Sequence, residues 1–210
     1  MNGGAALAGR YGRWPEPRAA AIAAGIGLWV FMGVATALFS LFLVAYVMRM
    51  SGSDAVQIAL PWQLWLSSAL LAAGSVALQR SAAAARGLLL RDTRRWLLAG
   101  GLGALGFLAV QWWAWAVLLA AQVMPAGNPG GSFFYLLTAV HGLHVAGGVA
   151  AWAWTARAAW QPAADPASLA WRIALCARYW HFLLAVWVVL FAALGWLTPE
   201  VARFICGVSS

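Results

Sequence analysis

Long uninterrupted runs of apolar residues dominate the sequence, and short polar segments separate them. Five runs approach or exceed about twenty residues, the length at which an α-helix crosses the hydrocarbon core of a bilayer. They cover Ala19–Met48, Leu60–Leu78, Trp96–Met124, Ser132–Ala156 and Ile173–Leu197. No polar segment is long enough to separate two domains. The sequence therefore predicts a single all-α integral membrane domain over residues 1–210, built as a bundle of five transmembrane helices.

The composition excludes an ordinary soluble domain. Hydrophobic residues make up 64% of the 210 residues and charged residues only 9%. A soluble domain of this size cannot bury so much apolar surface, because its outside must still face water. Lipid is the solvent that suits such a surface.

The charges predict how the chain is oriented in the membrane. Thirteen basic residues, all arginine, stand against five acidic residues and give a net charge of +8. The arginines concentrate in the N-terminal tail and in the second and fourth connections, which is the arrangement of cytoplasmic segments in membrane proteins. We therefore expect a cytoplasmic N-terminus and an external C-terminus. A nucleic-acid partner is not expected.

The acidic residues argue against a proton pump or an ion-coupled transporter. All of them lie in tails or connections: Glu16, Asp54, Asp92, Asp165 and Glu200. Proton pumps and most secondary transporters hold a carboxylate near the middle of the membrane. A transporter of a neutral solute stays open, although the sequence has no visible inverted repeat.

Three histidines lie within the predicted spans and allow two interpretations. His141 and His144 are three residues apart and share one face of the fourth span, and His181 lies on the fifth. At about 1.5 Å per residue, His144 and His181 reach depths of roughly 18 and 12 Å from the cytoplasmic end. They could meet there as haem or metal ligands, but without cysteine or carboxylate the ligand set is thin. Hydrogen bonding between packed helices is the favoured interpretation.

A cluster of glycines superficially resembles a phosphate-binding loop. Gly100, Gly101, Gly103 and Gly106 lie inside the third apolar run. No strand precedes them and no Lys-Ser/Thr pair follows, so the phosphate-loop interpretation is rejected.

Two long motifs resemble a known family. Residues 133–145, FFYLLTAVHGLHV, followed by Gly147 and Gly148, resemble the TGxHGLHVxxG signature helix of subunit III of haem–copper terminal oxidases. Residues 179–187, YWHFLLAVW, resemble the YWHFVDVVW motif of the same family. Weaker matches are GLWVF at residues 27–31, Leu38-Phe39, and Gln111 for the glutamine of QxxEY.

The resemblance implies a function without catalysis in this chain. Subunit III of the short five-helix bacterial form packs on catalytic subunit I, with subunit II in the same complex, and binds phospholipid in a cleft. Haem and copper are expected in the partner subunits, and the complex in the bacterial cytoplasmic (inner) membrane, where it supports aerobic electron transport. The resemblance assigns lipid-binding or helix-packing roles, with no catalytic or metal role, to His141, His144, Arg178, Trp180 and His181.

The chain also departs from the family. Three acidic positions of the family carry apolar residues here, namely Ala35, Ala114 and Leu184. Their loss puts a direct role in proton uptake in doubt, while packing and lipid binding do not depend on them. We expect a cytochrome c oxidase as the complex, with a quinol oxidase or a nitric oxide reductase as alternatives. A stand-alone membrane metalloprotein with His144 and His181 as ligands is the rival from another class.

Overall fold

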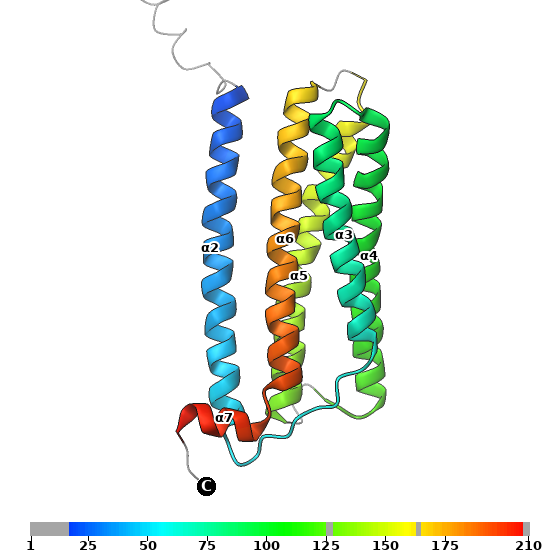
Figure 1. Cartoon of the computed structure of the whole chain (residues 1–210). Coiled ribbons are helices and arrows are strands. Elements are labelled where there is room, and N and C mark those ends of the chain that lie inside the picture. The colour runs from blue at the N-terminus through cyan, green and yellow to red at the C-terminus, as the bar shows by residue number, and fades with distance from the viewer. Residues whose placement is uncertain (1–16, 125–127, 163–164, 208–210) are drawn as a thin grey trace, which may run out of the picture.

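The predicted helical fold is confirmed. The computed structural model describes residues 17–124, 128–162 and 165–207, and regular structure in these ranges is helical (Figure 1). The helices in chain order are α2 (Pro17–Met50), α3 (Gln63–Arg86), α4 (Leu90–Ala120), α5 (Pro129–Ala159), α6 (Pro166–Trp196) and α7 (Pro199–Cys206).

Four helices form a closed bundle, and α2 leans on its side. Helices α3 and α4, α4 and α5, α5 and α6, and α6 and α3 are in contact, so the four make a ring. Helix α2 runs alongside this ring and touches only α5, α6 and the short α7 among the described helices (Figure 1). Much of the surface of α2 is therefore exposed, including the side chains of Trp29, Val34 and Leu41.

Four of the helices are long and apolar enough to cross a membrane: α2, α4, α5 and α6. The second predicted span lies mostly within α3, which has 24 residues but is more polar than the other four. Buried small polar side chains account for part of that polarity, because Ser67, Ser75 and Ser81 all face the interior. Four of the five predicted spans thus correspond to helices that can cross a membrane, and the crossing by α3 remains a prediction.

The charged connections are shorter than the apolar runs suggest. Helix α3 continues to Arg86 and α4 already begins at Leu90, so only three residues join them. The apolar pattern predicts an end at Leu78 and a start at Trp96. The helices extend beyond these predicted span ends because arginines near the membrane surface lower the hydropathy without interrupting the backbone hydrogen bonds of a helix.

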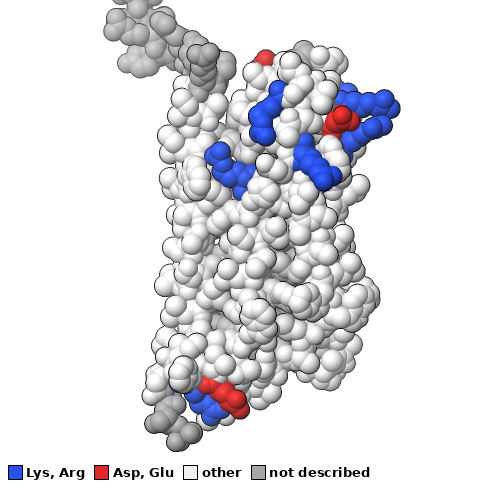
Figure 2. Space-filling model, in the orientation of Figure 1, with Lys and Arg blue, Asp and Glu red and all other residues white. Residues whose placement is uncertain are grey.

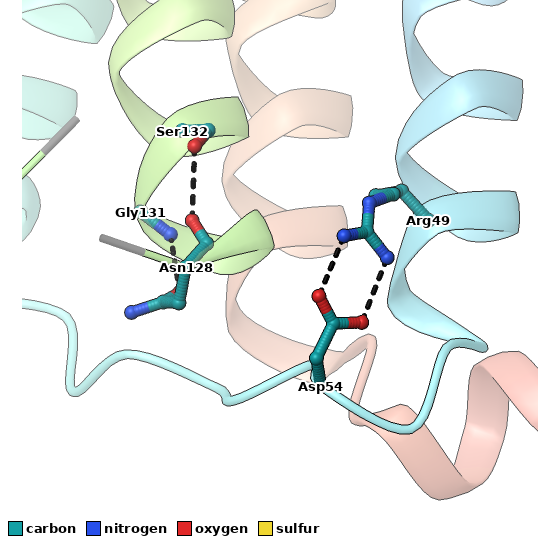
Figure 3. A network of polar contacts seen from close by, with 5 residues as sticks. All are labelled: Arg49, Asp54, Asn128, Gly131 and Ser132. Carbon is teal, nitrogen blue, oxygen red and sulfur yellow. Dashed lines mark hydrogen bonds and ion pairs between the residues drawn. The ribbon is translucent and has the colours of Figure 1, made fainter. Parts of the chain in front are cut away.

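Side-chain caps fix where α5 and α6 begin. The backbone N–H of Gly131 donates to Asn128 Oδ1 at 2.9 Å, and that of Ser168 donates to Asp165 Oδ2 at 2.8 Å. A proline follows each cap at the first helical position, where a missing N–H costs little. Figure 3 shows the Asn128 cap beside the ion pair of Arg49 and Asp54.

Helix α7 is not predicted from the sequence, because its eight residues are too few for a span. It lies across the end of the bundle where α2 finishes (Figure 1). Its Ala202 is buried, whereas Phe204 and Ile205 are exposed. Gly207, with a φ of 67°, ends the helix in the left-handed conformation that glycine adopts readily.

The glycines of α4 serve helix packing. A Cβ added at Gly103 would lie 2.9 Å from Gly74 Cα and 2.9 Å from the Leu70 carbonyl oxygen, both on α3. A Cβ at Gly101 would collide with the indole of Trp152 on α5. Glycine at position 103 therefore lets α3 approach α4 closely, and glycine at position 101 makes room for a tryptophan of α5.

Positive charge gathers at one end of the molecule. Figure 2 shows the arginine side chains mostly toward the end where α3 joins α4 and α5 joins α6. Arg94 at this end donates to the Ala159 carbonyl at 2.9 Å, and the Arg80 guanidinium lies 4.8 Å from the Trp96 ring centroid. The opposite end carries the balanced pair of Arg49 and Asp54.

Candidate functional site

His141 lies at the centre of the bundle. Its side chain is fully buried, and its ring centroid is 5.1 Å from that of Trp187 on α6 and 5.7 Å from that of Phe107 on α4. Phe39 of α2 lies on a further side at 6.2 Å. Neither ring nitrogen has a hydrogen-bond partner among the described residues. The imidazole therefore packs as an aromatic ring between the helices, and its two nitrogens form no hydrogen bond within the described part of the chain.

His144 faces α2. Its Nδ1 lies 2.8 Å from the Val140 carbonyl oxygen of its own helix, and its ring centroid is 5.3 Å from that of Phe39 and 5.9 Å from that of Phe31. The Tyr179 hydroxyl on α6 donates to the backbone carbonyl of His144 at 3.0 Å. His144 therefore sits where α2, α5 and α6 meet.

His181 faces α3 instead. Its Nδ1 lies 2.6 Å from the Ser75 hydroxyl, and its Nε2 lies 3.1 Å from Gln79 Oε1. Because His144 packs against α2 and His181 against α3, the structure does not bring these two imidazoles together at one site. No group of three His, Cys, Asp or Glu side chains in the described ranges is placed to hold a metal ion. The geometry gives the metalloprotein interpretation no support.

Trp180 and Arg178 occupy contrasting positions on α6. Trp180 is fully buried, and its indole lies beside the Cys176 thiol one turn earlier on α6. Arg178 is exposed, and its guanidinium lies 5.6 Å from the ring centroid of Trp29 on α2. Such a cation–π contact holds a guanidinium over an indole face. Arg178 thus links α6 to α2, while Trp180 fills the core of the bundle.

A cavity of about 420 Å³ lies between α2 and the α5 and α6 helices of the bundle. Its walls are mostly apolar and come from three helices, with Leu28, Phe31, Gly147, Ala151, Leu175 and Tyr179 among the lining residues. A Cβ added at Gly147 would meet no other atom within 4 Å, which shows that the wall is open at this position. The cavity lies beside His144, since Phe31 and Tyr179 contact both.

Arg172 joins this cavity to a second one. It lines the apolar cavity and also a neighbouring hollow of about 580 Å³ that includes Arg157 and Gln161. The Nε of Arg172 is buried without a hydrogen-bond partner among the described residues, and its guanidinium lies 5.6 Å from the Trp171 ring centroid. An apolar cavity lined by one arginine, beside a hollow that holds a second one, suits a molecule with an acyl chain and an anionic head.

Sequence reasoning missed Arg172 as a site residue. From the sequence alone, the charge of Arg172 indicates only which side of the membrane its connection lies on. The Trp-Arg pair at the start of an apolar run, followed by Arg178 two turns later, is the signal that could have pointed to it.

The positions at which the family carries acids are apolar and mostly buried. Ala35 and Ala114 are 3% and 0% exposed, and Leu184 is partly buried on α6. No neighbouring side chain among the described residues supplies a carboxylate in their place, because the described acids Asp54, Asp92, Asp165 and Glu200 lie at the ends of the helices.

The comparisons with known proteins confirm the resemblance over about half of the chain. A protein of Mycobacterium bovis and one of Nocardia farcinica, both named probable cytochrome c oxidase subunit 3, are 33% and 32% identical over 105 residues. The matches cover 48% of this chain and 49% of each relative. A protein of Mycobacterium leprae with the same name is 34% identical over 48% of this chain and 50% of its own length. The chain thus spans about half the length of the curated relatives it matches. No family model matches the chain.

Proposed function

Since the chain is a divergent relative of the cytochrome c oxidase subunit III family, we propose that it is a non-catalytic accessory subunit of a bacterial respiratory haem–copper oxidase. In this role it packs on catalytic subunit I, in a complex that also contains subunit II, and binds lipid. The observation that carries the proposal is the relationship to proteins named cytochrome c oxidase subunit 3. The same names favour cytochrome c over quinol as the electron donor of the complex.

The cavity between α2 and the bundle supports the lipid-binding part of the proposal. Its apolar walls suit an acyl chain, and Arg172, which lines it, offers a guanidinium to a phosphate group. Hydrogen bonds from a guanidinium to phosphate are charge-assisted and about twice as strong as neutral ones. A lipid here also fills the space beside His144 and so supports the packing of α2. Arg178 and Trp29 fix α2 at a neighbouring position.

The buried side chains give the site residues their proposed roles. His141 and Trp180 pack the bundle, His144 supports the wall of the lipid cavity, and His181 joins α6 to α3. None of them carries chemistry in this proposal. Haem, copper and the reduction of oxygen belong to the partner subunits, and a direct role of this chain in proton uptake is not proposed.

The distribution of arginines supports a cytoplasmic location for the charged end of the molecule. Arginines concentrate in cytoplasmic connections of membrane proteins, and the α3–α4 and α5–α6 connections lie at this end (Figure 2). A fifth crossing by α3 then places the two termini on opposite sides of the bacterial inner membrane. Helix α7 lies at the external surface in this orientation.

Purification of the tagged full chain in mild detergent tests the proposal. We expect a haem–copper catalytic subunit in the sample, identified by mass spectrometry, together with its optical spectrum and oxidation of reduced cytochrome c. His144→Ala should weaken assembly or lipid retention while the haem spectrum of the remaining complex is unchanged. A chain purified alone with a haem signal that His144→Ala abolishes would overturn the proposal. Oxidation of quinol instead of cytochrome c would change the electron donor only.

A further inference from the structure

A row of small residues runs along the outer face of α5. Ala139, Gly142, Ala146, Ala150 and Ala153 recur at intervals of three or four residues, and none of them is buried. At about 1.5 Å per residue the row is roughly 21 Å long, most of the way across a hydrocarbon core of about 30 Å. A Cβ added at Gly142 would meet no other atom within 4 Å. Small side chains in such a row allow another transmembrane helix to approach closely.

A buried amide points into the surface beside this row. Gln111 of α4 lines a cavity of about 180 Å³ together with Ala139 and Gly142 of the row. The Gln111 side chain is only 5% exposed, and neither its Oε1 nor its Nε2 has a hydrogen-bond partner among the described residues. A carboxamide that is buried in this way is costly unless a partner outside the described residues reaches it.

Two further polar groups that line the cavity, the Trp115 indole N–H and the Thr138 hydroxyl, are already engaged. The Trp115 indole N–H donates to Thr138 Oγ1 at 3.1 Å, and the Thr138 hydroxyl donates to the Phe134 carbonyl at 2.6 Å. A bound water needs about two to four polar partners, and the described residues that line the cavity offer it the Gln111 amide and the indole N–H of the exposed Trp112. A lipid chain offers no hydrogen bond at all. An indole N–H can donate to Gln111 Oε1 but cannot accept from Nε2, whereas a group that both donates and accepts and that reaches the cavity from the membrane satisfies both atoms of the amide.

We propose that the outer face of α5 is the docking surface for a transmembrane helix of the catalytic subunit, which inserts a carboxamide, carboxyl or hydroxyl side chain into the cavity at Gln111. Gln111 lies about 13 Å along α4 from its end at Ala120, so the inserted group meets the amide within the hydrocarbon region. The exposed side chains of Trp112 and Leu143 stand beside the docking surface and pack against the flanks of the incoming helix. This inference rests on the proposed function and names the face that meets the partner.

The test uses the whole complex, purified through a tag on this chain. Gln111→Met removes the hydrogen bond at nearly constant volume, and Ala146→Leu adds bulk in the middle of the row. Each should lower retention of the catalytic subunit by about threefold or more after a detergent wash. The matched control is Ala185→Leu, which adds the same bulk on the exposed face of α6 and should leave retention unchanged.

A second measurement does not depend on a weakened complex. A photoreactive residue at position 146 should form a cross-link to a transmembrane helix of the catalytic subunit, and one at position 185 should not. Cross-links from position 146 only to lipid or to a second copy of this chain would overturn the inference. So would equal retention by the wild type, Gln111→Met and Ala146→Leu. Failure of the wild-type chain to retain any catalytic subunit would instead overturn the proposed function.

Discussion

The imidazole of His181 on α6 and the hydroxyl of Ser75 on α3 lie 2.6 Å apart, measured from Nδ1 to Oγ. This contact joins the most polar of the long helices to the rest of the bundle. Trp187 makes a second link one to two turns along α6, where its indole N–H donates to Ser68 Oγ at 2.8 Å. Together with the contact of His181 Nε2 and Gln79 Oε1, these side-chain hydrogen bonds fix α3 against α6.

Loss of the Ser75 hydroxyl should loosen this interface. We expect Ser75→Ala to lower the free energy of unfolding by about 0.6 kcal/mol, the average for hydrogen bonds between membrane helices, and by no more than about 1.7 kcal/mol. Thermal unfolding of the detergent-solubilised protein is the measurement. Ser53→Ala, in the exposed connection between α2 and α3, is the matched control and should have no effect. Equal stability of the Ser75→Ala variant and the wild type would show that the contact contributes nothing.

Two glycine substitutions should have opposite effects. At Gly103 a methyl group meets the backbone of α3 at 2.9 Å, so the helices must separate. We expect Gly103→Ala to lower the free energy of unfolding by about 1 to 3 kcal/mol, as overpacked cores do. At Gly33 on α2 the same methyl group meets nothing within 4 Å. Gly33→Ala should leave stability unchanged or raise it by up to about 1 kcal/mol, because alanine favours the helix.

Comparison of the two variants under the same unfolding conditions separates packing from helix propensity. A loss of stability in both would indicate that α2 is packed by an outside partner at Gly33. No loss in Gly103→Ala would contradict the close approach of α3 and α4.

The Arg49–Asp54 pair should respond to acid. Arg49 donates two hydrogen bonds to the Asp54 carboxylate, at 2.8 and 2.6 Å (Figure 3). The hydrogen bond from Arg49 lowers the pKa of Asp54 below its ordinary value of 3.8. A depressed carboxyl pKa stabilises the folded state above the ordinary pKa, and this contribution is lost as the pH falls through the folded-state pKa.

The predicted signature is a pH-dependent difference between the wild type and Asp54→Asn. Unfolding midpoints should differ slightly near neutral pH, since exposed ion pairs contribute little, and should converge as the pH falls below the ordinary pKa of an aspartate. High salt should also reduce the difference at neutral pH. A difference that grows in acid would contradict the assigned direction of the pKa shift.

The sequence predicted the long helices because their signal is local. Apolar runs such as Ala19–Met48 report length and hydropathy directly, and α2 (Pro17–Met50) follows this run within two residues at each end. Helix α7 was missed because eight residues carry no span signal. Helix α3 extends beyond the predicted span end at Leu78 for the same local reason, since arginines in a helix lower the hydropathy as the end of a span does.

The arrangement of the site depends on how each helix is rotated, and the sequence does not reveal this. Depth along the helices put His144 and His181 at comparable levels, but packing turns His144 toward Phe39 and His181 toward Ser75. Arg172 was missed for the same reason, because its proposed role depends on the cavity between α2 and the bundle, which the sequence does not reveal. Gln111 was recognised only as part of a weak motif, and its unpartnered amide emerges from the packing of α4 on α5.

Arg172 should control how firmly lipid is held. A guanidinium–phosphate hydrogen bond contributes about 1.5 to 3 kcal/mol. We therefore expect Arg172→Gln to reduce the lipid that co-purifies with the chain by about tenfold, since about 1.4 kcal/mol corresponds to a factor of ten. Mass spectrometry of the extracted lipid, per mole of protein, is the measurement. Arg91→Gln changes an exposed arginine at the same end of the bundle and is the matched control. An equal loss of lipid in both variants would indicate nonspecific attraction to the charged end.

Replacement of the buried His141 by an apolar residue of similar shape is expected not to lower the stability of the protein. Its imidazole is fully buried among Phe39, Phe107 and Trp187, and neither nitrogen has a partner among the described residues. Replacing an unpartnered polar group by an apolar group of similar shape removes a desolvation cost of about 1 to 3 kcal/mol. We expect His141→Phe to leave the free energy of unfolding unchanged or to raise it. His141→Ala should instead lower it by about 2 kcal/mol or more, because the vacated space becomes a cavity.

A clear loss of stability in His141→Phe, measured by thermal unfolding in detergent, would show that a bound water or a partner's side chain engages the imidazole. In that case His141 anchors a polar contact at the centre of the bundle and does not simply fill it.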